Sequence, residues 1–181
     1  EQARRHEFLG PDVFVVNGEV ESLPLRNVWA IWNENNRGLD VAIELLSKKT
    51  ARYDRSKKKD IYERRLQTPE YFCYDPLTQR FEGWRLDAMG RYQPIEPGMN
   101  GRLFSEQTGL WLGKWDGEYV QANTTWLRWF DGDGNVVLLQ AESEAMRAES
   151  EAQRANAATQ RAEAAEAELQ RLRELLQARG E

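Results

Sequence analysis

The stretch from Ala141 to Arg179 contains neither proline nor glycine and consists almost wholly of Ala, Glu, Arg, Gln and Leu. These residue types have high helix propensities, so the stretch predicts one continuous helix, about 60 Å long at 1.5 Å per residue. The rest of the chain is long enough for one domain of ordinary size. We therefore expect a domain over residues 1–138, followed by an alanine-rich charged helix over residues 139–181.

A seven-residue repeat runs along this predicted helix, visible at Arg147-Ala148, Arg154-Ala155 and Arg161-Ala162. Extending that register places one set of small and apolar residues on the a/d seam of a coiled coil: Ala158, Ala162, Ala165, Leu169, Leu172 and Leu176. Alanine buries little area, so a coiled coil would be weak except near its C-terminal end. Two interpretations stay open, namely a solvated single helix and self-association, with a homodimer as the expected form.

The first part of the chain reads as strands alternating with a helix. Val13–Val16 is an unbroken apolar run, and residues 40–47 place Val41, Ile43 and Leu45 on one face of a second strand. Residues 54–66 predict a helix, which begins at or just before Asp54. Residues 71–74 predict a third strand. This order predicts an α/β or α+β fold with a mixed sheet.

From Phe81 to Leu139 the chain is rich in aromatic residues and turn glycines. The short alternating runs at residues 110–113 and 126–130 predict antiparallel hairpins. The aromatic side chains fit the core of a small sheet, while stacking on nucleic-acid bases is the alternative.

The charge distribution is uneven. The net charge is −5, but nine Lys or Arg against three Asp or Glu lie between Lys48 and Arg65. Such a segment can neutralise phosphates, or it can be a solvated helix face. With Cys73 as the one cysteine, no internal disulfide forms, and no apolar run is long enough for a membrane span; we expect a cytoplasmic protein.

Two of the predicted strands carry acidic residues. Asp12 opens the first, and Glu44 lies in the second with Asp40 on the same face. Carboxylates bind hard divalent cations through oxygen, and a nearby lysine offsets charge on a phosphoryl group. Spacing alone does not decide between this chemistry and ordinary roles for Asp12 in a turn and Glu44 on an exposed strand.

The order of several short motifs resembles the Uma-type family of the PD-(D/E)XK nuclease superfamily. Its landmarks occur here in sequence: Pro11-Asp12, the run Asp40 to Ser47 that ends Glu-x-Leu-Ser, then Asp54, Lys58 and Tyr62, then Glu70-Tyr71-Phe72 and Asp75-Pro76. The resemblance implies a restriction-endonuclease-like mixed sheet. Because family members carry a further segment before the Pro-Asp strand, we expect the N-terminal part of the domain to be truncated.

The resemblance also implies a metal-dependent DNA endonuclease. Asp12 and Glu44 would be the metal ligands for Mg²⁺ or Mn²⁺, and Lys58 the catalytic lysine, with DNA as the partner. The superfamily pattern places the lysine two residues after the acid, where this chain has Leu46, so the lysine is expected to have moved to the following helix. Additional site candidates are Asp40, Asp54 and Tyr62, and the candidate phosphate contacts are Lys48, Lys49, Arg52, Lys57 and Lys59.

A second hypothesis belongs to another class of protein. The chain could be an inactive nuclease fold that binds or scaffolds through its C-terminal helix. The two hypotheses differ in geometry, since the nuclease needs Asp12, Glu44 and Lys58 close together. A histidine-based triad or a zinc site is excluded, because the sequence offers only His6 and Cys73.

Overall fold

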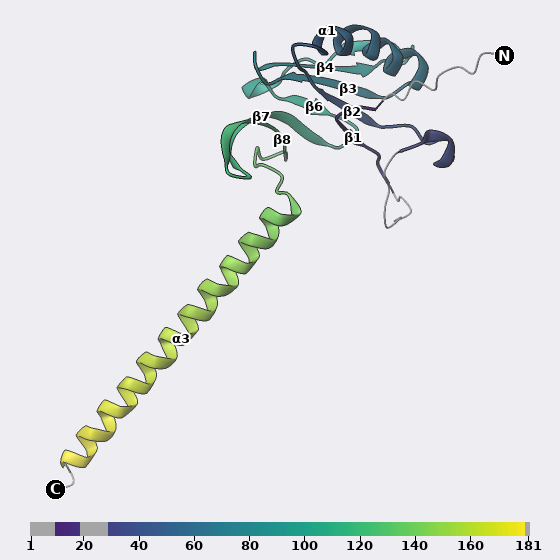
Figure 1. The fold of residues 1–181 in the computed structure, drawn as a ribbon. Helices are drawn as coiled ribbons and strands as arrows, with labels where there is room; N and C mark the ends of the chain where they lie inside the picture. Colours follow the sequence, from purple (N-terminus) through teal and green to yellow (C-terminus); the bar gives the residue numbers. More distant parts are fainter. Residues whose placement is uncertain (1–9, 19–28, 180–181) are drawn as a thin grey trace. The chain divides into compact units, whose positions relative to one another are not determined.

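The computed structural model describes residues 10–18 and 29–179, with side chains described up to residue 175. His6 therefore lies outside the described residues. The chain divides into two compact units, Glu1–Val137 and Leu138–Glu181. Figure 1 shows the first as an assembly of strands with a short helix and the second as one long helix.

The first unit is built on a five-stranded mixed sheet, which confirms the expected α+β fold. The strand order is β1-β2-β3-β4-β5. Only β2 and β3 are parallel, and the other neighbours are antiparallel. The strands are β1 (Val13–Val15), β2 (Val41–Leu45), β3 (Glu70–Asp75), β4 (Arg80–Leu86) and β5 (Tyr92–Pro94).

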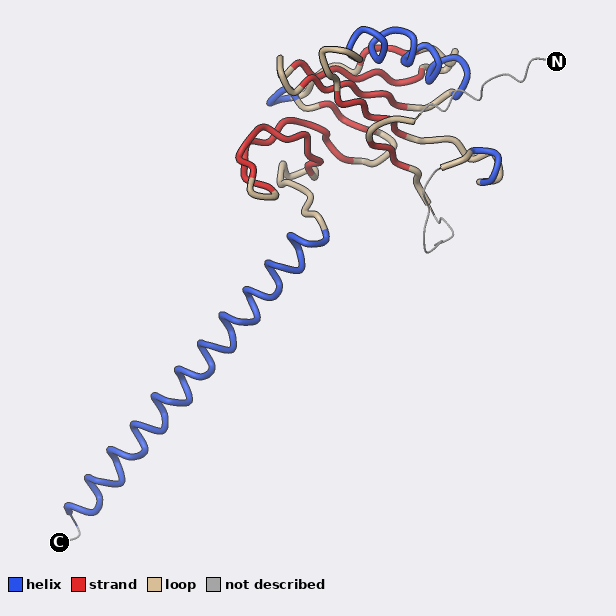
Figure 2. The backbone as a smooth tube through the Cα atoms, viewed as in Figure 1, coloured by secondary structure: helices blue, strands red, loops and turns tan. Residues whose placement is uncertain are grey.

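A helical crossover over residues 51–66 joins β2 to β3, because parallel neighbours cannot be joined by a tight turn. It comprises α1 (Ala51–Tyr53), η2 (Asp54–Lys58), α2 (Lys59–Ile61) and η3 (Tyr62–Leu66), and Figure 2 shows it along one face of the sheet. It begins before Asp54, since the Ala51 amide already donates to the Ser47 carbonyl. It ends at Gln67, which is in the left-handed region with φ 49°.

Alternate residues of β2 enter two different cores. Ala42 and Leu46 pack with Tyr62 and Tyr71 on the helix-covered face, while Val41 and Ile43 pack with Phe72 on the other face. A second, antiparallel sheet supplies Leu103 and Leu112 to that other core. Its strands are β6 (Leu103–Ser105), β7 (Leu110–Tyr119) and β8 (Ala122–Phe130), and the 3₁₀ turns η1 (Ile31–Asn33) and η4 (Met99–Gly101) lie in the connections.

The second unit contains α3 (Gln140–Arg179), one continuous helix as the composition predicts. Nearly all of its described side chains are exposed, including Leu169, Leu172 and Leu175. Across the described residues, no helix combines the length and apolar character that crossing a membrane requires.

Candidate nuclease site

The first two acidic residues of the site face each other across β1 and β2. Val13 lies opposite Ile43 in the antiparallel register, and one further step places Asp12 opposite Glu44. The backbone amide of Leu45 donates a hydrogen bond of 2.7 Å to Asp12 Oδ2. This bond holds the Asp12 carboxylate beside the C-terminal end of β2, where Glu44 lies.

Glu44 is buried, with 1% of its surface exposed, and its charge partner comes from the helical crossover. Lys58 Nζ lies 2.7 Å from Glu44 Oε1 and 3.8 Å from Asp54 Oδ1. Lys58 and Glu44 thus form a short ion pair at the end of β2. The structure thus brings together Asp12, Glu44, Asp54 and Lys58.

Burial and like charges determine the electrostatics of Glu44. Burial raises the pKa of its carboxyl group to about 7; the Lys58 ammonium opposes this shift, while Asp12 and Asp54 add to it. The Tyr62 hydroxyl is buried beside these acids and has no hydrogen-bond partner among the described residues. Burial, and then the charge of Glu44, raise the pKa of Tyr62, so its hydroxyl stays protonated and can only act as a hydrogen-bond donor or acceptor.

Asp40 lies at the other end of β2, away from this cluster. The Asn17 amide donates a hydrogen bond of 2.6 Å to Asp40 Oδ2, and this contact fixes the segment that follows β1. Asp40 and Glu44 are four positions apart along the strand, which corresponds to about 13 Å. Asp54, in contrast, is buried in the helical crossover and faces Lys58.

A comparison with models of protein families shows the family of this chain. The model of the Uma2 family, described as "Putative restriction endonuclease", matches residues 3–114, more than half of the chain. The chain belongs to the Uma2 family. The resemblance carried by the motifs is therefore confirmed, and the match extends from before β1 into β7. No curated protein matches the chain.

Within this Uma2 domain the acidic site suits a hard divalent cation. Restriction-endonuclease families generally use divalent metals, and the charges of Asp12 and Asp54 both act on Glu44, whose positive partner is Lys58. Among the described side chains, no three His, Cys, Asp or Glu are close enough to bind one ion together. A set of three such ligands is not a requirement for Mg²⁺, which commonly keeps several waters and binds through one or two carboxylates.

The basic segment of the Uma2 domain divides into two groups. Arg55 and Lys59 are used inside the fold: Arg55 Nε lies 2.8 Å from Glu82 Oε2, and Lys59 Nζ lies 4.2 Å from the centre of the Trp84 ring. The other group is exposed: Lys48, Lys49, Arg52, Lys57, Arg64 and Arg65.

Glu82 and Trp84 were missed by the sequence reasoning, which treated residues 81–139 as a separate region. In the register of the main sheet, Glu44 lies beside Cys73 and Cys73 beside Glu82, so one row crosses β2, β3 and β4. The Asp75-Pro76 turn followed directly by the alternating run Arg80–Leu86 is the signal that would have placed β4 in this sheet.

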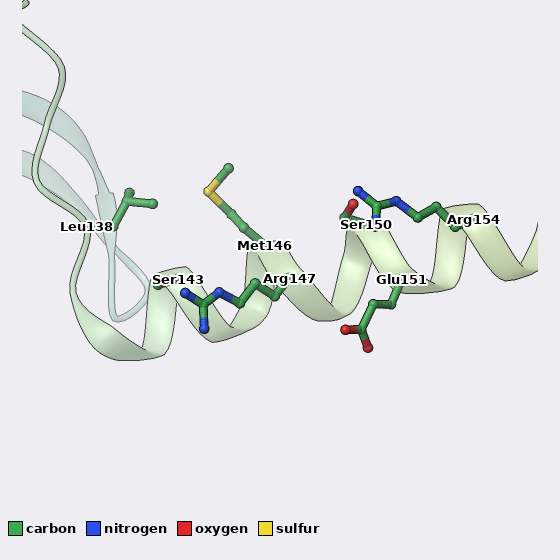
Figure 3. A pocket seen from close by; sticks show the side chains of 7 residues that line it. All are labelled: Leu138, Ser143, Met146, Arg147, Ser150, Glu151 and Arg154. Carbon is green, nitrogen blue, oxygen red and sulfur yellow. The ribbon is translucent and has the colours of Figure 1, made fainter.

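Two surface hollows among the described residues lie apart from the acidic site. One is formed along the start of α3 by residues between Leu138 and Arg154 (Figure 3). Another is lined by residues of β4, β5 and β6, including Arg85 and Phe104. Neither contains the paired carboxylate and lysine that phosphodiester chemistry needs.

Proposed function

We propose that this Uma2 protein is a metal-dependent DNA endonuclease that hydrolyses phosphodiester bonds, with Asp12, Glu44 and Lys58 as its catalytic residues. The observation that carries the proposal is the 2.7 Å contact between Lys58 Nζ and Glu44 Oε1, at the sheet edge where Asp12 is also held. A lysine and paired carboxylates can support metal-assisted phosphodiester hydrolysis, and here they come from three segments that are distant in the sequence.

Each residue has a separate role in the proposed reaction. Asp12 and Glu44 would hold Mg²⁺ or Mn²⁺, which when bound polarises the phosphoryl group and lowers the pKa of the attacking water. Lys58 would orient that water and offset charge on the phosphoryl oxygens. The water oxygen bonds to phosphorus as the ester P–O bond breaks. The water releases a proton, and the departing oxygen takes one up from solvent.

DNA would be held by the basic segment near the site. The exposed cations Lys48, Lys49, Arg52 and Lys57 are suited to phosphate contacts. Lys59, the fifth expected phosphate contact, instead holds its ammonium over the Trp84 ring. Such contacts depend on charge and shape and carry no base preference. A cytoplasmic homodimer would place two such sites on one duplex, with one cut in each strand.

Nicking of supercoiled plasmid tests this proposal. With Mg²⁺ or Mn²⁺ we expect relaxed circles to accumulate with the parent chain, and no reaction in EDTA. Asp12→Asn and Glu44→Gln should each lose nicking. Glu82→Gln is the matched control, because Glu82 lies on the same face but pairs with Arg55. Absence of metal-dependent nicking by the parent, or equal nicking by the Glu44 variant, would overturn the proposal.

The second candidate function is a scaffold that works through α3. The exposure of Leu169 and Leu172, at 54% and 50%, favours it. In that case the domain would not cut DNA under any metal condition, and removal of residues 139–181 would abolish partner binding. Retention of nicking after this removal would favour the endonuclease.

A further inference from the structure

The C-terminal half of α3 exposes leucines at coiled-coil spacing. Leu169 and Leu172 are three positions apart and are 54% and 50% exposed. In the heptad register they occupy one a and one d position, and alanines occupy the preceding ones: Ala155 and Ala162 at a, Ala158 and Ala165 at d. Apolar side chains at these positions are typical of a helix face that packs against another helix.

Charged residues flank this face on both sides. Arg161 and Glu168 occupy g positions, while Glu166 and Arg173 occupy e positions. Within the described part of α3 no ion pair involves any of these four residues. Arg161, Glu166 and Arg173 also have no oppositely charged residue three or four positions away, so their own helix offers them no side-chain partner.

We propose that a second copy of this chain packs on this face, parallel and in register, as a two-stranded coiled coil over residues 155–176. In a parallel pair, each g residue meets the e residue five positions further along the other helix. Arg161 then meets Glu166 of the second copy, and Glu168 meets Arg173 of the second copy. Both contacts are attractive, and the symmetry of the pair repeats each of them.

The first half of α3 lacks these properties, which sets the start of the coil. Glu144 and Glu151 occupy d positions there, where each would lie against the same glutamate of the second copy and repel it. Arg147 and Arg154, at g positions, would meet uncharged residues. Figure 3 shows Arg147, Glu151 and Arg154 along this part of the helix. The coil would therefore join the chains through the C-terminal half of α3, and both chains would enter the coil at its N-terminal end.

Engineered disulfides test the direction and the register. Cys73 is buried and is the one native cysteine, so a new cysteine on α3 reports cleanly. Ala162→Cys lies at an a position, so the new cysteines of the two copies should form a disulfide with each other under mild oxidation. Ala167→Cys, on the outer face, is the matched control and should cross-link several-fold more slowly. Equal rates for the two variants, or no cross-link at Ala162→Cys, would overturn the parallel in-register pair.

Charge exchange provides a second test, made on the full chain by sedimentation. Glu168→Arg turns an attractive contact into a repulsive one and should raise the dimer Kd about tenfold. Adding Arg173→Glu to it restores the contact only in the parallel arrangement, so the double variant should return to the parent Kd. Leu172→Ala should weaken the dimer while helix content by circular dichroism stays unchanged. A double variant as weak as the single one, or a parent chain that stays monomeric at about 1 mM, would contradict the proposal.

Discussion

Lys58 Nζ lies 2.7 Å from Glu44 Oε1, although the two residues come from the crossover helix and from β2. Leu46, two residues after Glu44, explains why the lysine is not on the strand. Its side chain is 3% exposed and packs with Tyr62 in the core beneath the helix. A lysine at position 46 would bury its charge there. The helix supplies the ammonium instead, from above the same carboxylate.

The raised pKa of Glu44 predicts a specific dependence of stability on pH in the absence of metal. Between its ordinary value of 4.5 and about 7, the folded state binds a proton that the unfolded state releases. The contribution of Glu44 to the free energy of unfolding is therefore largest below pH 4.5 and falls as pH rises to about 7, by up to about 3 kcal/mol.

Urea unfolding in EDTA, at pH 5 and pH 8, measures this difference. The parent should lose more stability than Glu44→Gln between the two values, because glutamine does not titrate. Parallel pH profiles for the two proteins would show that the Glu44 pKa is not raised.

The Tyr62 hydroxyl is expected to destabilise the folded state. It is buried and lacks a hydrogen-bond partner among the described residues. Tyr62→Phe should therefore raise the free energy of unfolding by about 1 kcal/mol. Because the raised pKa keeps this hydroxyl protonated, the variant should also keep plasmid nicking within about tenfold of the parent. A loss of stability would mean that the hydroxyl has a partner in solution.

Arg85 and Glu70 link the two sheets and should contribute strongly to stability. Glu70 is fully buried on β3 and accepts from Arg85 Nε at 2.9 Å, from Ser105 Oγ and from the Glu106 amide. Arg85→Ala leaves this carboxylate without its charge partner and should cost about 3 kcal/mol in urea unfolding. Arg80→Ala, the control, removes an exposed partner of Glu82 and should cost less than about 1 kcal/mol. Similar costs for the two would contradict this assignment.

Cys73 should be unreactive in the folded protein. Burial raises the pKa of its thiol to about 12, so almost no thiolate is present at neutral pH. A thiol reagent should therefore modify the protein only as fast as it unfolds, and at once in urea. Rapid modification of the folded chain would show that β3 is open to solvent.

The order of short motifs, through its resemblance to the Uma-type family, implied that Asp12, Glu44 and Lys58 lie close together, and the structure brings them together. Strand alternation and the helix repeat alone decide only which side chains of one element share a face. The same local rules identified α3, whose composition allows little besides a helix. The helix start was placed too late, since the turn at Ser47 and Thr50 depends on hydrogen bonds that propensity does not reveal.

Contacts between segments that are distant in the sequence could not be predicted from local patterns. Asp40 shares a strand face with Glu44 by alternation, yet its partner is Asn17 at the far end of β2. The Arg55–Glu82 ion pair and the Glu70 network depend on which strand lies next to β3, and a sequence without the sheet order does not specify this.

The proposed catalytic role of Lys58 is tested most directly by comparing two lysine variants. Rates of plasmid nicking with Mg²⁺ should be measured for the parent, for Lys58→Ala and for Lys57→Ala, whose side chain is exposed on the same helix. We predict that Lys58→Ala loses about 100-fold or more, as expected for a group that stabilises the transition state, while Lys57→Ala loses at most a few-fold. Equal rates for the two variants would contradict the assignment of Lys58.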